Sequence, residues 1–464
     1  MVSTGCEERE SSSARAWGTS TTSEAELRRL AWEILHSERS APLRRVAEAT
    51  ADPGIDARDR AFLRRLIGTE VRRRGTLRAL VRRFATGRPD RDLEIHLRLG
   101  FVQMFFLDQV PDHAVLAETV RAAKQTHGPR RGAYVNAVLR RALSARRPGV
   151  CGDPTRDLPL RDLHLAEAAF ADPSEHPLLW AEDALSMPAA LMKRWIRRYG
   201  EPRAFELALG ALVEPDLSLR VLGDREEIAR ELETLGCPTR PGGHPRILLA
   251  PVASTQQILH SPAFERGRIT VQGETALRAA ELLEAKAGER LLDMCAAPGG
   301  KSAVLAGSGA RVIATDPNPR RLARALETAR RLGSPGPLEL VACDGGKGLV
   351  PGSFDGVLVD VPCSNTGVLA QRPEARWRFT PAARRSLAAI QDRLLAEAAA
   401  CVRPGGRLVY STCSIEPEEN RRRVDALLGR RTDLVLEAEI EMLPDPRRAS
   451  GPIDGGYAAR LRGR

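Results

Sequence analysis

Two cysteines stand where a thiolate could act as a nucleophile. Cys363 lies in DVPCSNTG and Cys413 in STCSIEPEEN, and each follows an apolar run typical of a strand and precedes a predicted helix start. The unpaired N–H groups at a helix start lower the pKa of a nearby thiol. A thiolate is a strong soft nucleophile that can add to an electron-poor ring carbon. For either residue alone, a buried cysteine that only fills space is the alternative.

Acidic residues end four successive predicted strands: Asp293, Asp316, Asp344 and Asp360. Asp316 follows Asp293 by 23 residues. An acid at this distance after the first strand can accept hydrogen bonds from both hydroxyls of a ribose. Each acid alone could be an ordinary helix cap. Four of them at one edge of a sheet predict a ligand site.

The segment DMCAAPGGKS connects the first of these strands to a predicted helix. Its glycines let the backbone approach a ligand closely, and the following helix start offers free N–H groups. The spacing is neither G-x-G-x-x-G nor G-x-x-x-x-G-K-[ST], which argues against a dehydrogenase and against a phosphate-loop ATPase. A purely structural turn is the alternative.

The elements that must position these residues alternate between short apolar runs and helical stretches from Val271 onward. This rhythm predicts an α/β domain with an open, doubly wound sheet, in which the ligand lies beyond the carboxyl ends of the strands. The predicted strands are Arg290–Met294, Arg311–Asp316, Leu338–Asp344, Gly356–Val361 and Gly406–Thr412.

The remainder of the chain divides by composition. Residues 1–22 are rich in Ser, Thr and Glu and predict a disordered tail. Ser23 and Glu26 fit a capping box, and the helical periodicity that follows predicts an all-helical domain over residues 23–146.

Residues 147–176 are rich in Pro and Asp and predict a linker with at most one short helix. A small α/β unit is expected over residues 177–270, and the larger α/β domain over residues 271–464.

The composition of the 464 residues, 42% hydrophobic and 28% charged, is that of a soluble globular protein. No apolar run is long enough to span a membrane and no secretory signal is present, so we expect a cytoplasmic protein. The net charge of +11 points to a polyanionic partner such as nucleic acid, with a coding bias toward arginine as the alternative. The eight cysteines show no C-x-x-C pattern, so we expect no metal site.

Taken together, these segments resemble the RNA (cytosine-5) methyltransferases that use S-adenosylmethionine. The matching segments are VQGE (271–274), DMCAAPGGKS, the Asp316 turn, Asp344, DVPCSNTGVLAQRPEARWR (360–378) and STCSIEPEEN. Upstream, segments 58–84, 97–124 and 132–141 resemble the NusB-type helical RNA-binding domain. This fusion is the arrangement of the bacterial 16S ribosomal RNA (cytosine-5) methyltransferases.

The resemblance implies a Rossmann-like methyltransferase domain preceded by a NusB-like domain and a small α/β unit. It assigns to Cys413 the addition to C6 of a cytosine, and to Cys363 a role in releasing the product. Asp360 would hydrogen-bond the pyrimidine at N3 or at its amino group, and Lys301 would stabilise charge near the reacting base.

The same resemblance implies the cofactor site. The methionine end of S-adenosylmethionine would lie in the loop from Cys295 to Lys301, the ribose at Asp316 and the adenine at Asp344. The expected cofactor-binding residues are Cys295, Ala296, Ala297, Pro298, Gly299, Gly300, Lys301, Asp316, Asp344 and Asp360. A later loop would contact the nucleotide, unless it is only a solvated basic loop, through Arg372, Arg376, Trp377 and Arg378.

We therefore expect a monomeric enzyme that acts on ribosomal RNA of the small subunit, with no membrane and no metal involved. Two alternatives remain: the same chemistry on transfer RNA, and a non-catalytic RNA-binding assembly factor. The second alternative predicts loss of Cys413, Cys363 or a cofactor-binding acid, and all of these residues are present.

Overall fold

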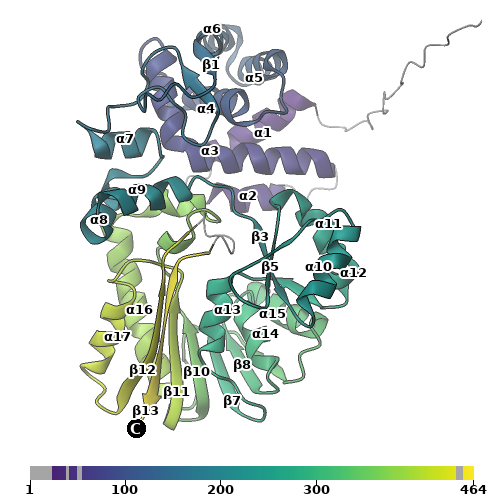
Figure 1. Ribbon diagram of the computed structural model, residues 1–464, viewed down its shortest axis with the longest axis vertical. Coiled ribbons are helices and arrows are strands. Elements are labelled where there is room, and N and C mark those ends of the chain that lie inside the picture. The colour runs from purple at the N-terminus through teal and green to yellow at the C-terminus, as the bar shows by residue number, and fades with distance from the viewer. Residues whose placement is uncertain (1–22, 38–40, 50–54, 446–452) are drawn as a thin grey trace, which may run out of the picture. The chain divides into compact units, whose positions relative to one another are not determined.

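Packing divides the computed structural model into two compact units (Figure 1). The first contains the described residues up to Glu70 together with Phe84–Ser144, and the second contains Val71–Arg83 together with Ala145–Arg464. The structure describes residues 23–37, 41–49, 55–445 and 453–464. The expected disordered tail, residues 1–22, lies outside this range.

The first unit is helical, as predicted. Ser23 and Glu26 form the expected capping box at its start, with Ser23 N donating to Glu26 Oε2 at 2.7 Å and Glu26 N donating to Ser23 Oγ at 3.3 Å. The helix α4 is buried along nearly its whole length and contacts α1 and α5. The helices of this region are α1 (Glu24–Ser37), α2 (Pro42–Ala49), α3 (Ala57–Phe84), α4 (Arg91–Phe106), α5 (Asp112–His127) and α6 (Pro129–Ala145).

The second half of α3 belongs to the second unit. The side chain of Thr76 is fully buried and donates to the carbonyl of Ala184 at 3.0 Å. The Trp377 indole donates to the carbonyl of Val71 at 2.8 Å. The packing thus divides at Ser144 and Ala145, close to the expected end of the helical domain, but it also assigns Val71–Arg83 of α3 to the second unit.

The stretch expected to be a linker contains a β-hairpin. Its strands β1 (Arg146–Pro148) and β2 (Leu163–Leu165) are antiparallel. Leu158, Leu165 and Phe170 are buried. The Pro and Asp residues of this segment form its turns, while these apolar side chains attach it to the rest of the unit.

A small antiparallel sheet precedes the main sheet, with the strand order β4-β5-β3-β6. Its strands are β3 (Leu217–Val221), β4 (Arg240–Pro241), β5 (Ile247–Ala250) and β6 (Ile269–Val271). The helices before and within this part are α7 (Pro177–Asp183), α8 (Ala189–Tyr199), α9 (Glu201–Gly210), α10 (Arg225–Thr234), α11 (Thr255–Leu259) and α12 (Pro262–Glu265).

The main sheet has seven strands in the order β12-β13-β11-β10-β7-β8-β9. The strands from β7 to β11 are parallel, as expected of a doubly wound sheet, while β13 runs antiparallel to both β11 and β12. The strand bounds are β7 (Arg290–Met294), β8 (Arg311–Thr315), β9 (Leu338–Val341), β10 (Phe354–Asp360), β11 (Val402–Thr412), β12 (Leu434–Met442) and β13 (Gly456–Gly463).

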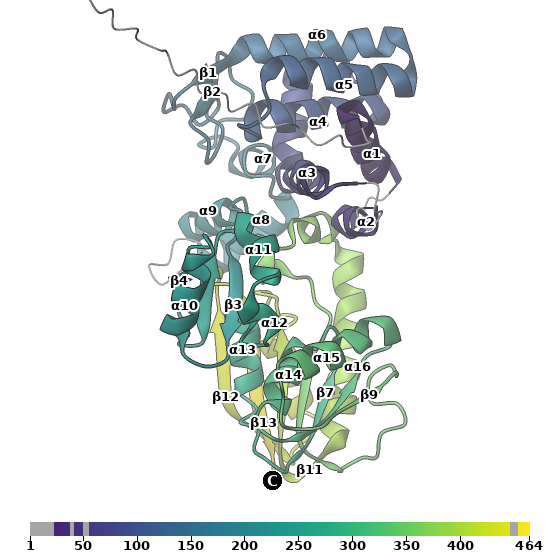
Figure 2. The same ribbon diagram turned by 90° about the vertical axis from the view of Figure 1, so that its right-hand side faces the viewer.

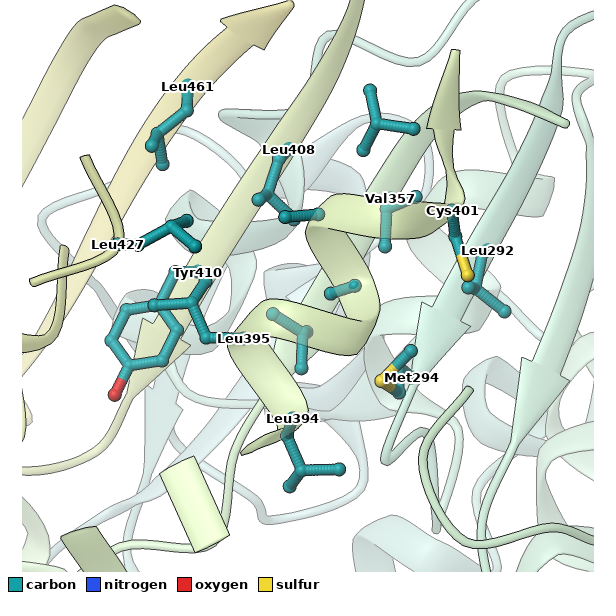
Figure 3. Packing of buried hydrophobic residues seen from close by; sticks show 14 of the residues in the cluster. Leu292, Met294, Val357, Leu394, Leu395, Cys401, Leu408, Tyr410, Leu427 and Leu461 are labelled. Carbon is teal, nitrogen blue, oxygen red and sulfur yellow. The ribbon is translucent and has the colours of Figure 1, made fainter. Parts of the chain in front are cut away.

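Helices cover both faces of this sheet, and the central strands therefore carry apolar residues on both faces and read as short apolar runs. Figure 3 shows one face, where Leu292, Val357 and Leu408 pack against Leu394 and Leu395. On that face lie α16 (Pro381–Cys401) and α17 (Arg421–Leu428), and on the other lie α13 (Glu274–Glu281), α14 (Gly300–Ala306) and α15 (Pro319–Arg331) (Figures 1 and 2). In the described part of the chain, no helix combines the length and apolar character needed to cross a bilayer.

Candidate active site

The two sulfur-bearing loops leave neighbouring parallel strands at the same edge of the sheet. Asp360, the last residue of β10, is the register partner of Ser411 in β11. Past the strand ends the loops remain joined, since Val361 N donates to Ser411 O at 3.1 Å and Gly367 N donates to Cys413 O at 3.0 Å. This pairing brings Cys363 and Cys413 together although about fifty residues separate them in the sequence.

The two thiols are in contact, with 3.1 Å between Cys363 Sγ and Cys413 Sγ. Cys363 is buried and Cys413 is partly exposed, so Cys413 is the sulfur that a ligand reaches first. The hydrogen bond with Cys413, together with burial, raises the pKa of Cys363 well above its ordinary value. Cys363 is therefore held as a thiol. The Cys413 sulfur also lies 3.2 Å from Asn365 Oδ1.

An ion pair stands beside the thiols. Lys301 Nζ lies 2.6 Å from Asp360 Oδ2, and the Ser411 hydroxyl donates to Asp360 Oδ1 at 2.7 Å. Burial by itself would lower the pKa of the Lys301 ammonium, but the charge and hydrogen bond of Asp360 outweigh it and raise that pKa. Asp360 and Lys301 thus form an ion pair at the sheet edge that carries the two thiols.

The loop after Cys363 is fixed by a buried acid that the sequence did not single out. Glu419 accepts hydrogen bonds from the backbone N–H of Ser364 at 3.1 Å and from its hydroxyl at 2.5 Å. Asn365 and Ser411 were likewise not predicted as site residues. All three lie inside the two cysteine signatures, but their contacts depend on how the loops fold against each other.

The helix α8 holds the loop that carries Cys413. The Trp195 indole donates to Glu416 Oε1 at 3.0 Å, and Arg194 Nε donates to Glu416 Oε2 at 2.9 Å. The Tyr199 hydroxyl donates to the Ile415 carbonyl at 2.9 Å. The region before β3 therefore supports the site, although its sequence carries no catalytic signature.

The loop between β7 and α14 forms a close turn at the same edge. Gly299 has a φ of 98° and a Cβ added there would lie 2.3 Å from Ala325 Cα, so only glycine fits. Ala296 N donates to Thr315 O at 2.9 Å, which ties the turn to β8. Burial raises the pKa of the Cys295 thiol to about 12, so this sulfur stays protonated.

The four predicted acids differ in surroundings. Asp293 and Asp316 are buried, and Asp316 accepts from Asn318 N at 2.9 Å. Asp344 is half-exposed and pairs with Arg393 at 2.8 Å, and this hydrogen bond lowers its pKa. The acids thus line one sheet edge from β7 to β10, as the sequence predicted.

Buried polar atoms without a partner mark the space beside this loop. Among the described residues, Asp293 Oδ1 and both amide atoms of Gln272 make no hydrogen bond. The Gln272 amide nitrogen lies 3.6 Å from the position of a Cβ on Gly300. A bound ligand that carries both hydrogen-bond donors and acceptors, such as the amino-acid end of S-adenosylmethionine, would satisfy these atoms, so the residues present fit this cofactor.

Several side chains of the basic loop after Cys363 bond to other parts of the protein and not to a site for a nucleotide. Arg376 is buried, and its guanidinium donates to the carbonyls of Pro373 at 3.1 Å and Ala211 at 2.8 Å, so it does not face a nucleotide. The Trp377 indole is bonded to the backbone of α3. The Arg372 guanidinium donates to Asn365 Oδ1 at 3.0 Å.

Of the expected nucleotide contacts, Arg378 does line a cavity of about 290 Å³ that opens beside Cys363. Arg384 of α16 lines the same cavity, and the sequence had not singled it out. Two arginine side chains therefore line the cavity beside Cys363.

Known proteins resemble this chain over most of its length. A family model described as 16S rRNA methyltransferase RsmB/F matches residues 280–447, and the NusB family model matches residues 25–144. Ribosomal RNA small subunit methyltransferase B of Xylella fastidiosa (strain 9a5c) is 33% identical over 88% of this chain and 89% of its own length. The probable ribosomal RNA small subunit methyltransferase B of Bacillus subtilis (strain 168) is 31% identical over 74% of each chain.

Solved structures share the fold. A crystal structure of PH0851 has a TM-score of 0.70 at 24% identity and covers 94% of this chain and 97% of that chain. NSun6 from Pyrococcus horikoshii, solved with SFG, has a TM-score of 0.51 at 22% identity and covers 60% of this chain and 98% of that chain.

These matches confirm the resemblance to methyltransferases with a NusB-like domain and confirm S-adenosylmethionine as the cofactor. The chain therefore belongs to the RsmB/F family of 16S rRNA methyltransferases and is an RNA methyltransferase that depends on S-adenosylmethionine.

Proposed function

We propose that this enzyme methylates C5 of a cytosine in 16S ribosomal RNA through a covalent bond between Cys413 and C6 of the base. The observation that carries the proposal is the contact of 3.1 Å between the Cys363 and Cys413 sulfurs beside the Asp360–Lys301 ion pair. One sulfur is needed to bind the ring, and a second acid–base group is needed to release it.

Cys413 is assigned the nucleophilic step because it is the more exposed of the two sulfurs. As its thiolate adds to C6, a sulfur–carbon bond forms and the electron pair of the C5–C6 double bond moves into the rest of the ring. The adduct is enamine-like at C5, which makes that carbon nucleophilic. The bound cofactor supplies an electrophilic methyl group on its sulfonium centre.

Asp360 is assigned to orient the base. An ionised carboxylate accepts hydrogen bonds and donates none. In its ion pair with Lys301 it therefore suits the exocyclic amino group of cytosine better than N3, which is itself an acceptor. The Lys301 ammonium would offset negative charge that develops on the ring during the addition.

Cys363 is assigned to product release. After methyl transfer the C5 proton passes to solvent, and the electron pair of the broken C–H bond re-forms the C5–C6 double bond as Cys413 leaves C6 as a thiolate, which restores the aromatic ring. Cys363 is the titratable group in contact with Cys413 Sγ, so it is placed to assist as that sulfur departs. The carboxylate of Asp360 keeps the base in position meanwhile.

The assignment to small-subunit ribosomal RNA is supported by the names of the relatives. The net charge of +11 suits a polyanionic substrate. Because the cysteine must reach the edge of an aromatic ring, the target base has to be single-stranded or flipped out of a stem. The residues at the cysteine edge do not encode which RNA carries that base, so transfer RNA is the competing substrate.

The first prediction is that Cys413→Ala abolishes methyl transfer, a loss of more than about a thousandfold, because no other described group replaces the nucleophile. Cofactor binding, measured by calorimetry, should change less than about twofold, since the cofactor loop does not contain this residue. Cys343→Ala, at a thiol outside the pair, is the control and should keep its activity. Retained turnover in Cys413→Ala would remove this sulfur from the nucleophile role.

The second prediction is that Cys363→Ala accumulates a covalent complex with RNA. The variant can form the bond from Cys413 to C6 but releases the methylated base slowly. We expect a slowly migrating band in a denaturing gel that requires both RNA and the cofactor. The double variant Cys363→Ala/Cys413→Ala should not form the band, and normal release by the single variant would refute the assignment.

Mapping of 5-methylcytosine by bisulfite treatment tests the substrate. Small-subunit ribosomal RNA and transfer RNA from cells without this protein would each be incubated with the full chain and the cofactor. We expect one newly protected cytosine in the ribosomal RNA and none in the transfer RNA, while the reverse result would support the competing substrate.

A further inference from the structure

Three side chains of different chemistry lie together in the hairpin formed by β1 and β2. Cys151, Asp157 and His164 each offer one atom that can bind a metal ion, and these atoms all lie within 4.8 Å of one another. The Cys151 sulfur lies 3.2 Å from Asp157 Oδ1. Neither family model covers this segment, since one match ends at residue 144 and the other begins at residue 280.

The backbone of the hairpin holds the thiol and the carboxylate in place. Asp157 and His164 face each other in an antiparallel bridge. The Asp157 carboxylate accepts the backbone N–H groups of Cys151 at 2.8 Å and Gly152 at 2.9 Å. The side chains of Cys151 and Asp157 are therefore positioned before any ion binds, so ion binding loses little conformational entropy.

The imidazole of His164 has the tautomer of a metal ligand. Its Nδ1 lies 2.8 Å from the carbonyl oxygen of Gly149. A carbonyl oxygen can only accept, so Nδ1 carries the proton and Nε2 keeps a free electron pair. Metal-binding histidines commonly donate their second ring N–H to a carbonyl, which fixes the tautomer and the ring plane.

We propose that this hairpin binds a Zn²⁺ ion through Cys151 Sγ, an Asp157 carboxylate oxygen and His164 Nε2, with water as the fourth ligand. Zinc binds these three ligand types at about 2.3, 2.1 and 2.0 Å in tetrahedral geometry, which puts neighbouring ligand atoms about 3.3 to 3.6 Å apart. The sulfur–oxygen distance of 3.2 Å is already close to that value.

The binding step balances in charge. The Cys151 thiol gives its proton to solvent as the sulfur–zinc bond forms, and this bond replaces the hydrogen bond from sulfur to Asp157. The thiolate and the carboxylate together offset the two positive charges of the ion. Cys151 is exposed, and the other two ligands are partly exposed, so an ion can enter from solvent.

The ion would reinforce the attachment of the hairpin to α3. Leu158 and Leu165 are buried, and the Arg73 guanidinium donates to the Pro159 carbonyl at 2.9 Å. Zinc would join both ends of the loop that carries these contacts. No metal site was expected because the cysteines form no C-x-x-C pair. The three ligands proposed here follow the spacing C-x5-D-x6-H instead.

The test uses the full chain, stripped of metal by a chelator and kept reduced, and titrated with Zn²⁺ against a chromogenic chelator. We expect one ion per chain, and binding at least about tenfold weaker in His164→Gln and in Asp157→Asn. The asparagine has nearly the same shape and keeps an oxygen for one of the two backbone N–H groups, so it disturbs the loop less than a truncation would. His176→Ala, at an exposed histidine outside the cluster, is the matched control and should bind as the native chain does.

A second measurement identifies the sulfur ligand. With Co²⁺ in place of zinc, the native chain should show thiolate-to-cobalt charge-transfer absorption, and Cys151→Ser should lose it. Zinc should also raise the melting temperature of the native chain but not that of His164→Gln. Equal zinc affinity in the native chain and all three ligand variants, or no zinc binding by the native chain, would overturn the proposal.

Discussion

Asp293 is a buried carboxyl group at the sheet edge, and its surroundings raise its pKa. Its side chain is fully buried, and burial raises its pKa to about 7. Ser302 donates a hydrogen bond to Oδ2 at 2.5 Å, but Oδ1 has no partner among the described residues. In the folded chain without cofactor the carboxyl group is therefore uncharged over much of the acidic range.

The third prediction concerns this group. Because its folded-state pKa lies above the ordinary value of 3.8, the folded chain binds more protons than the unfolded chain between these two values. The stability that Asp293 contributes is fully present below about pH 4 and is lost as the pH rises through 7. Asp293→Asn, which cannot ionise, should therefore raise the melting temperature more at pH 8 than at pH 5.

Circular dichroism of the cofactor-free native and variant chains at both pH values checks this result. Ser302→Ala keeps the ionisable group but removes a hydrogen bond that lowers its pKa, so the melting temperature of this variant should fall at least as steeply between pH 5 and pH 8 as that of the native chain. Equal effects of Asp293→Asn at pH 5 and pH 8 would show that the buried carboxyl group does not titrate in this range.

At the scale of elements, the strands of the central sheet were predictable from the sequence because they are buried on both faces and read as short apolar runs. The bounds of β7 were predicted without error, and those of β8 and β10 within two residues at each end. The strand β12 was missed, since its sequence LVLEAEIEM carries acidic residues on its partly exposed face. The hairpin of β1 and β2 was missed because its Pro and Asp residues resemble those of a linker.

The same contrast applies to the site. Thiols and acids at strand ends were predictable, because parallel strands bring their carboxyl ends to one edge. Contacts between loops were not predictable. Arg376 belongs to a basic stretch that suits a nucleotide, yet its guanidinium is buried against backbone carbonyls. The role of Glu419 could not be predicted, because it depends on the fold of the loop after Cys363.

The fourth prediction tests the turn between β7 and α14. Gly299→Ala places a Cβ 2.3 Å from Ala325 Cα and strains a φ of 98°, so the turn must move. We expect cofactor binding to weaken at least about tenfold, measured by calorimetry. Gly429→Ala, after the end of α17 and outside the cofactor loop, is the matched control, because its Cβ would meet its nearest neighbour at 3.5 Å, and it should bind the cofactor as the native chain does.

At the scale of the whole molecule, the division of the chain into two units does not follow its helices. The helix α3 contributes residues up to Glu70 to one unit and Val71–Arg83 to the other. Gly75 lies on the part that packs within the second unit, where an added Cβ would lie 2.1 Å from the Glu182 carbonyl oxygen.

The fifth prediction follows from this packing. Helix propensity alone would make Gly75→Ala stabilising by about 1 kcal/mol. The clash with Glu182 reverses the sign, so we expect a lower melting temperature of the full chain. Gly68→Ala in the same helix is the control: its Cβ would meet Leu43 Cδ2 at an ordinary 3.8 Å, and this variant should melt at or above the native temperature. A stabilised Gly75→Ala would contradict the packing described for α3.

From the contact between the Cys363 and Cys413 sulfurs we expect the activity to depend on the redox state of these two thiols. At 3.1 Å the two sulfurs need to approach by only about 1 Å to form a disulfide, in a reaction that transfers two electrons to an oxidant such as peroxide and releases two protons. A disulfide leaves no thiolate free to attack a base. Methylation would then continue only where a reductant keeps both sulfurs in the thiol form.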